Sequence, residues 1–336
     1  MAWYNNQENK NDVVLSSRVR LARNLEGYPF ASRLGDEEAR EIIEKVGGLL
    51  EKGGFASIDF TDISPVRAGM LWEKHYVSHD FVNKKGPHTL MLNESMGLAV
   101  MLCEEDHIRI QSILGGLALD KAYQNACAAD DYLSGELPIA YHQELGFLTH
   151  CPTNLGTAMR ASVMMFLPAL TMAGRIGTLA NHLSKIGLTM RGFYGEGTGA
   201  QGALYQISNQ ITLGITEEDT LRKLSDAVRQ IVESEHELRA LITPEKNPKT
   251  VDRICRAEGV LRHAYLLSSD EFLTHYADVR LGVALGLLSG IDLSTLDTLL
   301  IEMMPYNLAH RENKTALGEK ERDLLRAKYI KEMLKR

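Results

Sequence analysis

Five arginines stand near the ends of predicted structural elements, and together they have the chemistry of a phosphate-binding site. Arg18 and Arg20 lie two residues apart in an extended segment, so both side chains point to one face. Arg109, Arg160 and Arg191 follow along the chain, with Arg160 predicted to start a helical turn and Arg191 to lie in a strand. A guanidinium binds phosphate oxygens in a bidentate way and stays charged. The set could hold a triphosphate without a P-loop lysine, whereas each arginine alone also fits a solvated salt bridge.

Three consecutive carboxylates, Glu104, Glu105 and Asp106, stand where a predicted buried strand over 98–104 ends. Clustered carboxylates repel one another and raise one another's pKa values unless a cation is near. A cationic substrate or a Mg²⁺-bound nucleotide would relieve that repulsion. A solvated loop or the first turn of a helix is the alternative interpretation.

Two further side chains could take part in chemistry. Cys151 precedes Pro152 and a predicted helix, and a thiol near a helix N-terminus can have a lowered pKa. A small buried residue is an equally good interpretation of Cys151. His75 is a lone histidine, which by itself favours a structural role.

A glycine-rich turn, GEGTGAQG (195–202), separates two predicted strands over 188–195 and 203–213. It contains GxGxxG, but a dinucleotide site needs a helix directly after that motif, and here a strand follows. The sequence has no GxxxxGK[ST] either, which excludes a P-loop enzyme. Arg191 and Glu196 flank the turn, where a mobile loop could close over a substrate. A flexible hairpin loop without function is the alternative.

The elements that must position these residues are both helices and strands, without regular βαβ alternation. This mixture predicts an α+β fold with an antiparallel or mixed sheet. Apolar residues at helical spacing predict helices over 37–50, with Asp36 as N-cap and Gly53 ending it, and over 117–133, 154–167 and 175–186. Thr216 and Asp219 resemble a capping box before a long helix, and the region after 250 is predicted to be mainly helical.

Composition narrows the function classes. The 336 residues include 37 basic and 44 acidic side chains, and a net charge of -7 argues against a general nucleic-acid binder. No apolar run is long enough for a membrane helix, and the N-terminus lacks the apolar segment of a secretory signal. Four cysteines without a CxxC pair argue against the usual zinc and thioredoxin sites. We therefore expect free thiols in a reducing cytoplasm.

Charge also predicts where the chain divides. Residues 1–242 carry a net charge of -8 and residues 243–336 a net charge of +1. The segment TPEKNPKT (243–250), with two prolines and no large apolar residue, is typical of a linker. We therefore expect a catalytic domain over 12–242 and a helical domain over 251–336.

Several segments together resemble the ATP:guanido phosphotransferase, or phosphagen kinase, family. The matching stretches are SSRVRLARN (16–24), EEDHIRIQS (104–112), CPTNLGTAMRASV (151–163), RGFYGEG (191–197) and ISNQITLG (207–214). The chain is most similar to the family's bacterial protein-arginine kinase branch. Only eleven residues precede Asp12, where small-molecule members carry an extra helical domain, and RDLLRA (322–327) matches the RDxxRA motif of that branch's phosphoarginine pocket.

The resemblance implies a role for each matching residue. Glu105 would orient the substrate guanidinium and take its proton, Glu196 would hold its other side, and the Cys151 thiolate would sit near the reacting nitrogen. The ATP site would comprise Ser16, Ser17, Arg18, Val19, Arg20, His75, Arg109, Arg160, Ala161, Ser162, Val163, Met164, Arg191, Gly192, Phe193, Tyr194, Gly195 and Glu196, with Mg²⁺ bound through ATP. Two positions depart from the family: Cys103 replaces the usual Asn, and Gly199 replaces a bulkier or acidic residue.

The C-terminal motif also has a physical interpretation of its own. On a helix, Arg322 and Arg326 are four residues apart and share a face, which suits a phosphate, while Asp323 could take a guanidinium. The alternative is a solvated terminal helix, since residues 319–336 hold seven basic and four acidic side chains. With the resemblance, Arg322, Asp323, Arg326 and Ala327 are expected to form an allosteric phosphoarginine pocket.

The implied function is the transfer of the ATP γ-phosphoryl group to arginine side chains of proteins, in stress-response regulation and Clp-dependent degradation. A small-molecule guanidino kinase and a non-catalytic phosphoarginine-binding adaptor are the alternatives. The implied partners are protein substrates such as a stress-response repressor, the zinc-binding activator McsA, the Clp protease machinery and a second copy of the chain. Neither a membrane nor direct nucleic-acid binding is expected.

Overall fold

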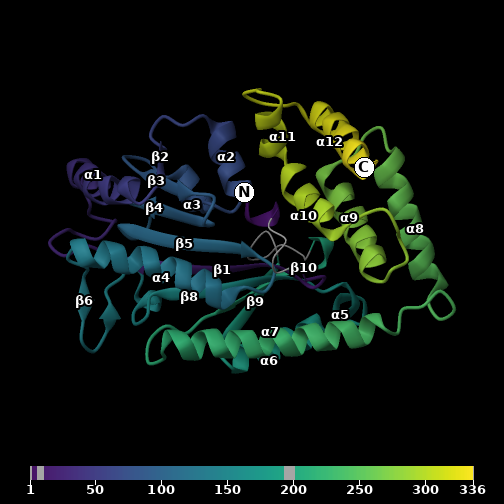
Figure 1. The fold of residues 1–336 in the computed structure, drawn as a ribbon, viewed down its shortest axis with the longest axis horizontal. Coiled ribbons are helices and arrows are strands. Elements are labelled where there is room, and N and C mark those ends of the chain that lie inside the picture. The colour runs from purple at the N-terminus through teal and green to yellow at the C-terminus, as the bar shows by residue number, and fades with distance from the viewer. Residues whose placement is uncertain (1, 6–10, 193–200, 336) are drawn as a thin grey trace.

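A large antiparallel sheet organises the molecule (Figure 1). The structure, a computed structural model, describes residues 2–5, 11–192 and 201–335. Within those residues the sheet has eight strands in the order β2-β3-β4-β5-β1-β8-β10-β9, and every neighbouring pair is antiparallel. The strands are β1 (Val14–Arg23), β2 (Ala56–Asp59), β3 (Thr89–Asn93), β4 (Leu98–Leu102), β5 (Ile108–Gly115), β8 (Met159–Phe166), β9 (Leu188–Gly192) and β10 (Leu204–Asn209), with a separate hairpin of β6 (Tyr141–His142) and β7 (Gly146–Phe147). The predicted α+β fold class is confirmed.

One face of the sheet is closed by a layer of helices. These are α1 (Asp36–Lys52), α4 (Leu119–Glu136), α5 (Pro168–Met172), α6 (Ile176–Lys185) and α7 (Glu217–Arg239). Successive side chains of a strand point to opposite faces, so β1 sends Val19 and Leu21 into this layer and Arg18 and Arg20 to the other side. The alternation in β1 therefore separates the apolar core from the charged face.

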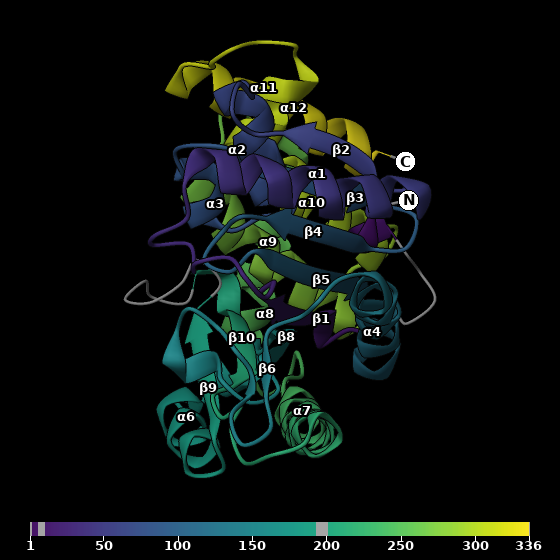
Figure 2. The same ribbon diagram turned by 90° about the vertical axis from the view of Figure 1, so that its left-hand side faces the viewer.

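The other face is covered at one end by shorter helices and by the C-terminal part of the chain, which lies behind the sheet in Figure 2. These elements are η1 (Trp3–Asn5), α2 (Pro65–Glu73), α3 (His79–Asn83), α8 (Pro248–His263), α9 (Ser269–Ala284), α10 (Leu293–Glu302), α11 (Pro305–Arg311) and α12 (Glu319–Leu334). Phe166 and Leu204 of the sheet share one apolar cluster with Phe272 and Leu300 of the C-terminal helices. The C-terminal helices are thus packed against the sheet.

Most predicted elements are present, and two predictions were wrong. The segment 154–167 is mainly the strand β8, and Arg160 lies in that strand. Strand β8 sits between β1 and β10 and is buried on both faces, so its sequence is a continuous apolar run that periodicity cannot distinguish from a buried helix. Helix α1 is capped by Gly35, one residue before the predicted Asp36, and the Glu38 side chain accepts a hydrogen bond from the Gly35 N–H at 2.9 Å.

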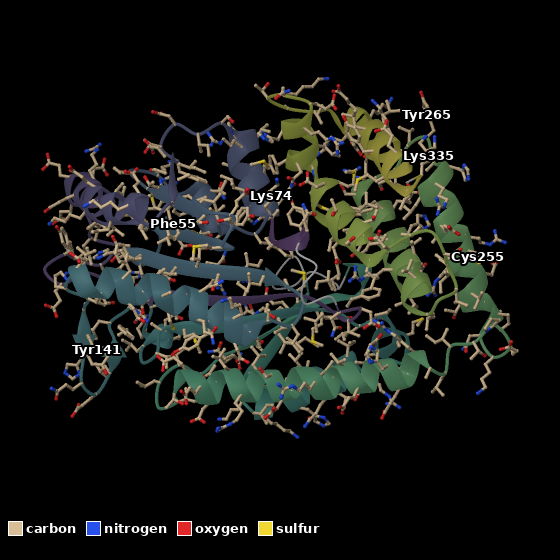
Figure 3. The ribbon with its side chains drawn as sticks, viewed as in Figure 1. Phe55, Lys74, Tyr141, Cys255, Tyr265 and Lys335 are labelled. Carbon is tan, nitrogen blue, oxygen red and sulfur yellow. The ribbon has the colours of Figure 1, made fainter. Side chains whose placement is uncertain are left out.

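The remaining helix boundaries follow local sequence chemistry. The Thr216 side chain accepts a hydrogen bond from the Asp219 N–H, as predicted for the start of α7, and Gly53 caps the C-terminal end of α1. All four cysteines lie in the described ranges and are free thiols, and Cys255 is exposed on α8 (Figure 3). Among the described helices, none has the length and apolar character needed to cross a bilayer.

Candidate active site

The charged face of the sheet carries a row of polar side chains from five adjacent strands, β5, β1, β8, β10 and β9. Arg20 of β1 lies opposite Gln111 of β5 and Arg160 of β8. Ser162 of β8 lies opposite Arg18 on one side and Ser208 of β10 on the other. The positions on β1 and on β8 are two residues apart, and Gln111 and Ser208 lie directly opposite them, so the strand period places all of these residues on the same face. By the same alternation, Arg109 of β5, two residues before Gln111, and Arg191 of β9, opposite Gln206, also lie on this face. The register therefore brings all five arginines named from the sequence to one face.

Arg18 and Arg20 are removed from solvent and lie beside other guanidinium groups. Removal from solvent, with Arg109 and Arg160 nearby, lowers the pKa of Arg18 to about 10, and the same causes together with Arg18 lower the pKa of Arg20. Their hydrogen bonds are few: Arg18 Nε lies 3.4 Å from Ser162 Oγ, and within the described residues the buried Nε of Arg20 has no partner. Such a cluster costs folding energy unless an anion is bound, which is the property of a site for a polyanion.

The three carboxylates after β4 have separate environments. Glu104 is buried and bonds to both Arg109 and the Ser78 hydroxyl. Burial opposes its ionisation, but Arg109 and these hydrogen bonds hold the pKa of Glu104 below its ordinary value. Glu105 points outward and is exposed, and partial desolvation followed by the charge of Asp106 raises the pKa of Glu105. Only Glu105 is thus available to an incoming cation.

Asp106 joins the Glu105 turn to the segment that carries Cys151. Its Oδ1 atom accepts hydrogen bonds from Asn24 Nδ2 at 2.6 Å and from the His150 N–H at 2.8 Å. Cys151 follows directly and precedes a single 3-10 turn, η2 (Pro152–Asn154), where the sequence had predicted a longer helix. The outcome differs because the chain must return to the sheet as β8 within a few residues.

Cys103, at the start of the same turn, faces away from this chemistry. Its Sγ atom lies 3.7 Å from the Ala39 carbonyl oxygen of α1, and the residue is fully buried. Burial raises the pKa of the Cys103 thiol to about 12. Its φ of 60° is in the left-handed region, which an Asn tolerates better than a Cys.

His75 lies directly beside the arginine row. It adopts a φ of 61° just after α2 ends, and its carbonyl oxygen accepts a hydrogen bond from Gln111 Nε2 at 2.7 Å. Burial, with a smaller contribution from Arg18, lowers the pKa of His75 to about 3. The imidazole is therefore neutral at physiological pH.

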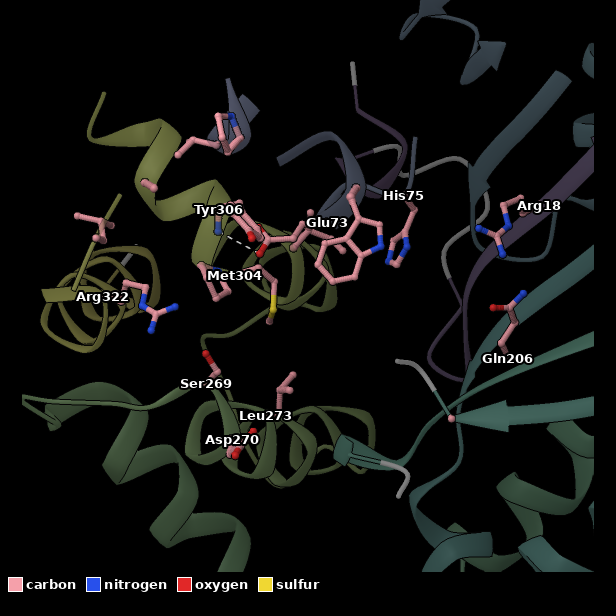
Figure 4. A pocket seen from close by; sticks show the side chains of 18 of the residues that line it. Arg18, Glu73, His75, Gln206, Ser269, Asp270, Leu273, Met304, Tyr306 and Arg322 are labelled. Atoms are coloured by element: carbon pink, nitrogen blue, oxygen red, sulfur yellow. Dashed lines mark hydrogen bonds between the residues drawn. The ribbon is translucent and has the colours of Figure 1, made fainter. Parts of the chain in front are cut away.

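A cavity of about 1320 Å³ extends from the arginine row to the C-terminal helices. Figure 4 shows Arg18 and Gln206 at one end, Arg322 at the other, and Glu73, His75 and Tyr306 between them. The lining also includes Arg20, Trp72, Arg160, Arg191, Gly192, Ser208, Leu273 and Met304. The space is continuous between the sheet and the C-terminal motif.

Not every residue predicted for the ATP site faces this space. Ser17 donates to the Gly116 carbonyl and accepts from the Ala118 N–H on the α4 side, and Val19, Ala161 and Val163 belong to the opposite core. Their side chains support the strands from behind, whereas Ser16, Ser162 and Met164 alternate with them. Phe193, Tyr194, Gly195 and Glu196, with Gly197 and Gly199 of the turn, lie outside the described residues.

The C-terminal motif contains one arginine at the cavity and one that is buried. Arg322 lines the cavity. Arg326 is 1% exposed and donates to the carbonyl oxygens of Met303 (3.0 Å) and Leu267 (2.7 Å). It also donates to Asp323 Oδ1 and to Ser269 Oγ, both at 2.8 Å, and Ala327 is buried beside it. The two arginines therefore do not form an open pair, and Asp323 is bonded to its own helix neighbour.

Comparison with known families decides the assignment of this site. Residues 38–238 match the model of the ATP:guanido phosphotransferase C-terminal catalytic domain. The chain belongs to the ATP:guanido phosphotransferase family. Residues 247–336 match the protein-arginine kinase McsB C-terminal domain, so the family membership extends through the C-terminal helices. The resemblance drawn from the sequence motifs is thereby confirmed.

Similar members of the family cover the whole chain. A protein-arginine kinase from Caldanaerobacter subterraneus subsp. tengcongensis is 40% identical over 329 residues, which are 96% of this chain and 97% of the relative. One from Clostridium acetobutylicum is 38% identical and covers 99% of both. Among solved structures, a lombricine kinase matches with a TM-score of 0.59 at 25% identity over 70% of each chain. The substrate-free duplicated taurocyamine kinase of Schistosoma mansoni matches with a TM-score of 0.59 at 27% identity over 74% of this chain and 38% of its own.

Several lining residues were not identified from the sequence. Gln206 and Ser208 line the cavity from β10, and Gln111 supports His75 from β5. A signal for the first two was present, because Gln206 and Ser208 alternate with the buried Tyr205 and Ile207. Trp72 and Glu73 gave no such signal, since a helix that packs on another part of the chain can turn any face toward a cavity.

Proposed function

We propose that this chain is a protein-arginine kinase, which transfers the γ-phosphoryl group of ATP to arginine side chains of proteins. The arginine row is the observation that carries the proposal, because its gathered positive charge favours a bound polyanion and because one of its members, Arg109, lies near the outward-pointing Glu105. The similar family members named above bear the name protein-arginine kinase and align with nearly all of this chain, which supports a protein as the acceptor.

The phosphate chain of ATP is assigned to Arg18, Arg20, Arg109, Arg160 and Arg191. Phosphoryl transfer depends mainly on in-line positioning and on positive charge around the transferred group. Mg²⁺ would be held by the phosphate oxygens of ATP and would add to that charge. Guanidinium groups that are fixed by the strand register need little reorganisation during the reaction. His75, which is neutral, is assigned to the adenosine end.

The acceptor arginine is assigned to Glu105, with Glu196 on its other side. A guanidinium has a pKa above ~12 and is a poor nucleophile until it loses a proton. In the proposed step a guanidinium nitrogen forms a bond to the γ-phosphorus, the bond from that phosphorus to the bridging oxygen of ADP breaks, and the nitrogen's proton passes to Glu105. The bonds of Asp106 to Asn24 and to His150 hold Glu105 and Cys151 on neighbouring segments.

The second proposed site is regulatory and lies at the Arg322 end of the cavity. The RDLLRA motif supports a phosphoarginine ligand there, and Arg322 is the member of the motif that lines the cavity. Because Arg326 is bonded to two backbone carbonyls, we assign it to holding the site together rather than to first contact with a phosphate.

The wider role is also proposed from the family relationship. The enzyme would act in the cytoplasm on stress-response repressors and other proteins with exposed arginines, would depend on the activator McsA, and would mark proteins for the Clp machinery. A homodimer is the proposed assembly.

The decisive experiment incubates the purified chain with ATP, Mg²⁺ and an unfolded protein, followed by mass spectrometry at neutral pH. We expect acid-labile phosphoarginine on the polypeptide and its absence with Glu105→Ala. Efficient labelling of free arginine but of no polypeptide would indicate a small-molecule kinase. An inactive wild type that still binds phosphoarginine would indicate an adaptor.

A further inference from the structure

A contact between α2 and α11 lies midway along the cavity, at a carboxylate that no step of the proposed reaction uses. Glu73 is the last residue of α2. Its Oε1 atom accepts a hydrogen bond from the Tyr306 N–H at 3.0 Å, and its Oε2 atom accepts from the Asn307 N–H at 2.8 Å and from Asn307 Nδ2 at 2.9 Å. Three donors of the C-terminal helices thus converge on one side chain of the catalytic part, and the Tyr306 bond is drawn in Figure 4.

A second contact on the same face of α2 brings the two helices unusually close. Gly69 is one helical turn before Glu73, and a Cβ atom there would lie 2.4 Å from the Tyr306 ring. Glycine is therefore required for this approach. The Tyr306 ring rests on the bare backbone of α2 while the Tyr306 N–H bonds to Glu73, so both the distance and the orientation of α11 are fixed.

Glu73 is half-buried at the wall of the cavity, and its carboxylate is partly removed from solvent. Removal from solvent raises the pKa of Glu73 to about 7, although its hydrogen bonds and the charge of Arg326 act in the opposite direction. An exposed surface carboxylate would have neither the raised pKa nor three fixed donors. We therefore conclude that the Glu73 carboxylate serves to bind the three donors of α11.

The neighbours of the contact connect both ends of the cavity. His75 follows Glu73 by two residues and lies beside Arg18. On the other side, Tyr306 and Asn307 follow Met303 by three and four residues, and the Met303 carbonyl is bonded to Arg326 of the C-terminal motif. A short chain of contacts therefore runs from α12 through α11 to the end of α2.

We propose that Glu73 is a positioning residue, which locks α11 onto α2 and thereby fixes His75 at the nucleotide end of the cavity. The inference rests on the proposed function in taking ATP as the ligand at that end. It adds a route by which a ligand beside Arg322 changes ATP binding, because α11 packs directly on α12. The Glu73 carboxylate itself does not contact the nucleotide.

The test measures the dissociation constant of a non-hydrolysable ATP analogue and the KM values for ATP and for a protein substrate. In Glu73→Gln, one carbonyl oxygen remains for three donors, and we expect nucleotide affinity to fall by about tenfold, or ~1.4 kcal/mol. The KM for the protein substrate should stay unchanged, because the acceptor site at Glu105 is on another element. A purely structural role would weaken both constants together.

Two graded variants keep the test valid if Glu73→Gln folds poorly. Asn307→Ala removes only one of the three bonds, and Gly69→Ala separates the helices without changing any charge. Each should weaken nucleotide binding by about threefold. Asp278→Asn is the matched control, because it removes a carboxylate that pairs with Arg253 inside the C-terminal helices. It should leave nucleotide binding at the wild-type value.

The outcomes separate this inference from the kinase proposal. Wild-type nucleotide affinity in both Gly69→Ala and the Glu73 variant would overturn the positioning role, as would an equal loss of affinity in Asp278→Asn. If the wild type binds the ATP analogue but phosphorylates no protein, the kinase proposal is wrong. The analogue affinities of the wild type and the variants can still be compared.

Discussion

The two ends of the cavity both present arginines, yet their surroundings differ in kind. At the sheet end, removal from solvent and then the charges of neighbouring arginines lower the pKa values of Arg18 and Arg20, and the buried Nε of Arg20 has no partner within the described residues. At the helical end, Arg326 is bonded to two carbonyls, a hydroxyl and a carboxylate. The first arrangement is unfavourable until an anion arrives, whereas the second is complete. Residue type alone therefore does not separate a binding arginine from a structural one, and the count of satisfied donors does.

The comparison also explains the distribution of charge along the chain. Residues 1–242 have a net charge of -8, and yet they hold the cationic row. Net charge describes solubility and long-range attraction, whereas a phosphate site depends on where a few side chains are fixed. An acidic protein can thus bind a polyanion locally, and the surrounding negative charge favours a cationic substrate.

The largest effect should come from the sheet end. Arg20→Ala removes a guanidinium from the centre of the row, and we expect kcat/KM for protein phosphorylation to fall by about 10³-fold or more. The free energy of unfolding should not fall, because crowded positive charge is relieved. Activity assays and urea unfolding of the same preparation check both statements, with the exposed Arg256→Ala as control. A loss of stability similar to that of Arg326→Ala would erase the proposed difference between the two ends.

At the helical end we expect a large loss of stability instead. Arg326→Ala leaves two buried carbonyls and Asp323 without their donor, so we expect the free energy of unfolding to fall by about 3 kcal/mol. Arg326→Lys keeps the charge but has one nitrogen for four acceptors, and its loss should be intermediate. Unfolding curves in urea measure this directly. Wild-type stability of Arg326→Ala would show that the buried bonds are dispensable.

A smaller effect tests the catalytic turn by pH. Asp106 raises the pKa of Glu105, after the larger contribution of desolvation. In Asp106→Asn that repulsion is gone, so the pKa of Glu105 falls toward its ordinary value. Because Glu105 must be ionised to accept a proton, the acid limb of the kcat/KM profile should move to lower pH. An acid limb at the wild-type pH would remove Glu105 as the group that controls it.

The sequence predicted the arginines at the sheet end of the cavity better than the contacts at the helical end. Arg18 and Arg20 share a face because of a strand period that is readable from two positions. Arg160 was placed on a helix, and only the register of β8 with β1 puts it opposite Arg20. The separation of Arg322 from Arg326 was not predictable, because helical spacing gives a shared face but does not reveal that the carbonyls of Leu267, before α9, and Met303, after α10, lie nearby. Glu73 was missed for the same reason, since its partners are more than 230 residues away in the chain.

At the helical end, the smallest change in stability is expected at Arg322, four residues before Arg326, where the largest change is expected. Arg322 is on the same helix as Arg326 and lines the cavity, and Arg322→Ala should change the free energy of unfolding by less than ~0.5 kcal/mol. The same variant should lose any stimulation of turnover by added phosphoarginine, because Arg322 is the cation that the described residues place on the cavity wall at this end. Stimulation is measured with a phosphoarginine peptide at fixed ATP, with an unphosphorylated peptide as control. If stimulation persists in Arg322→Ala, the regulatory ligand binds elsewhere, and the two ends of the cavity differ only in stability.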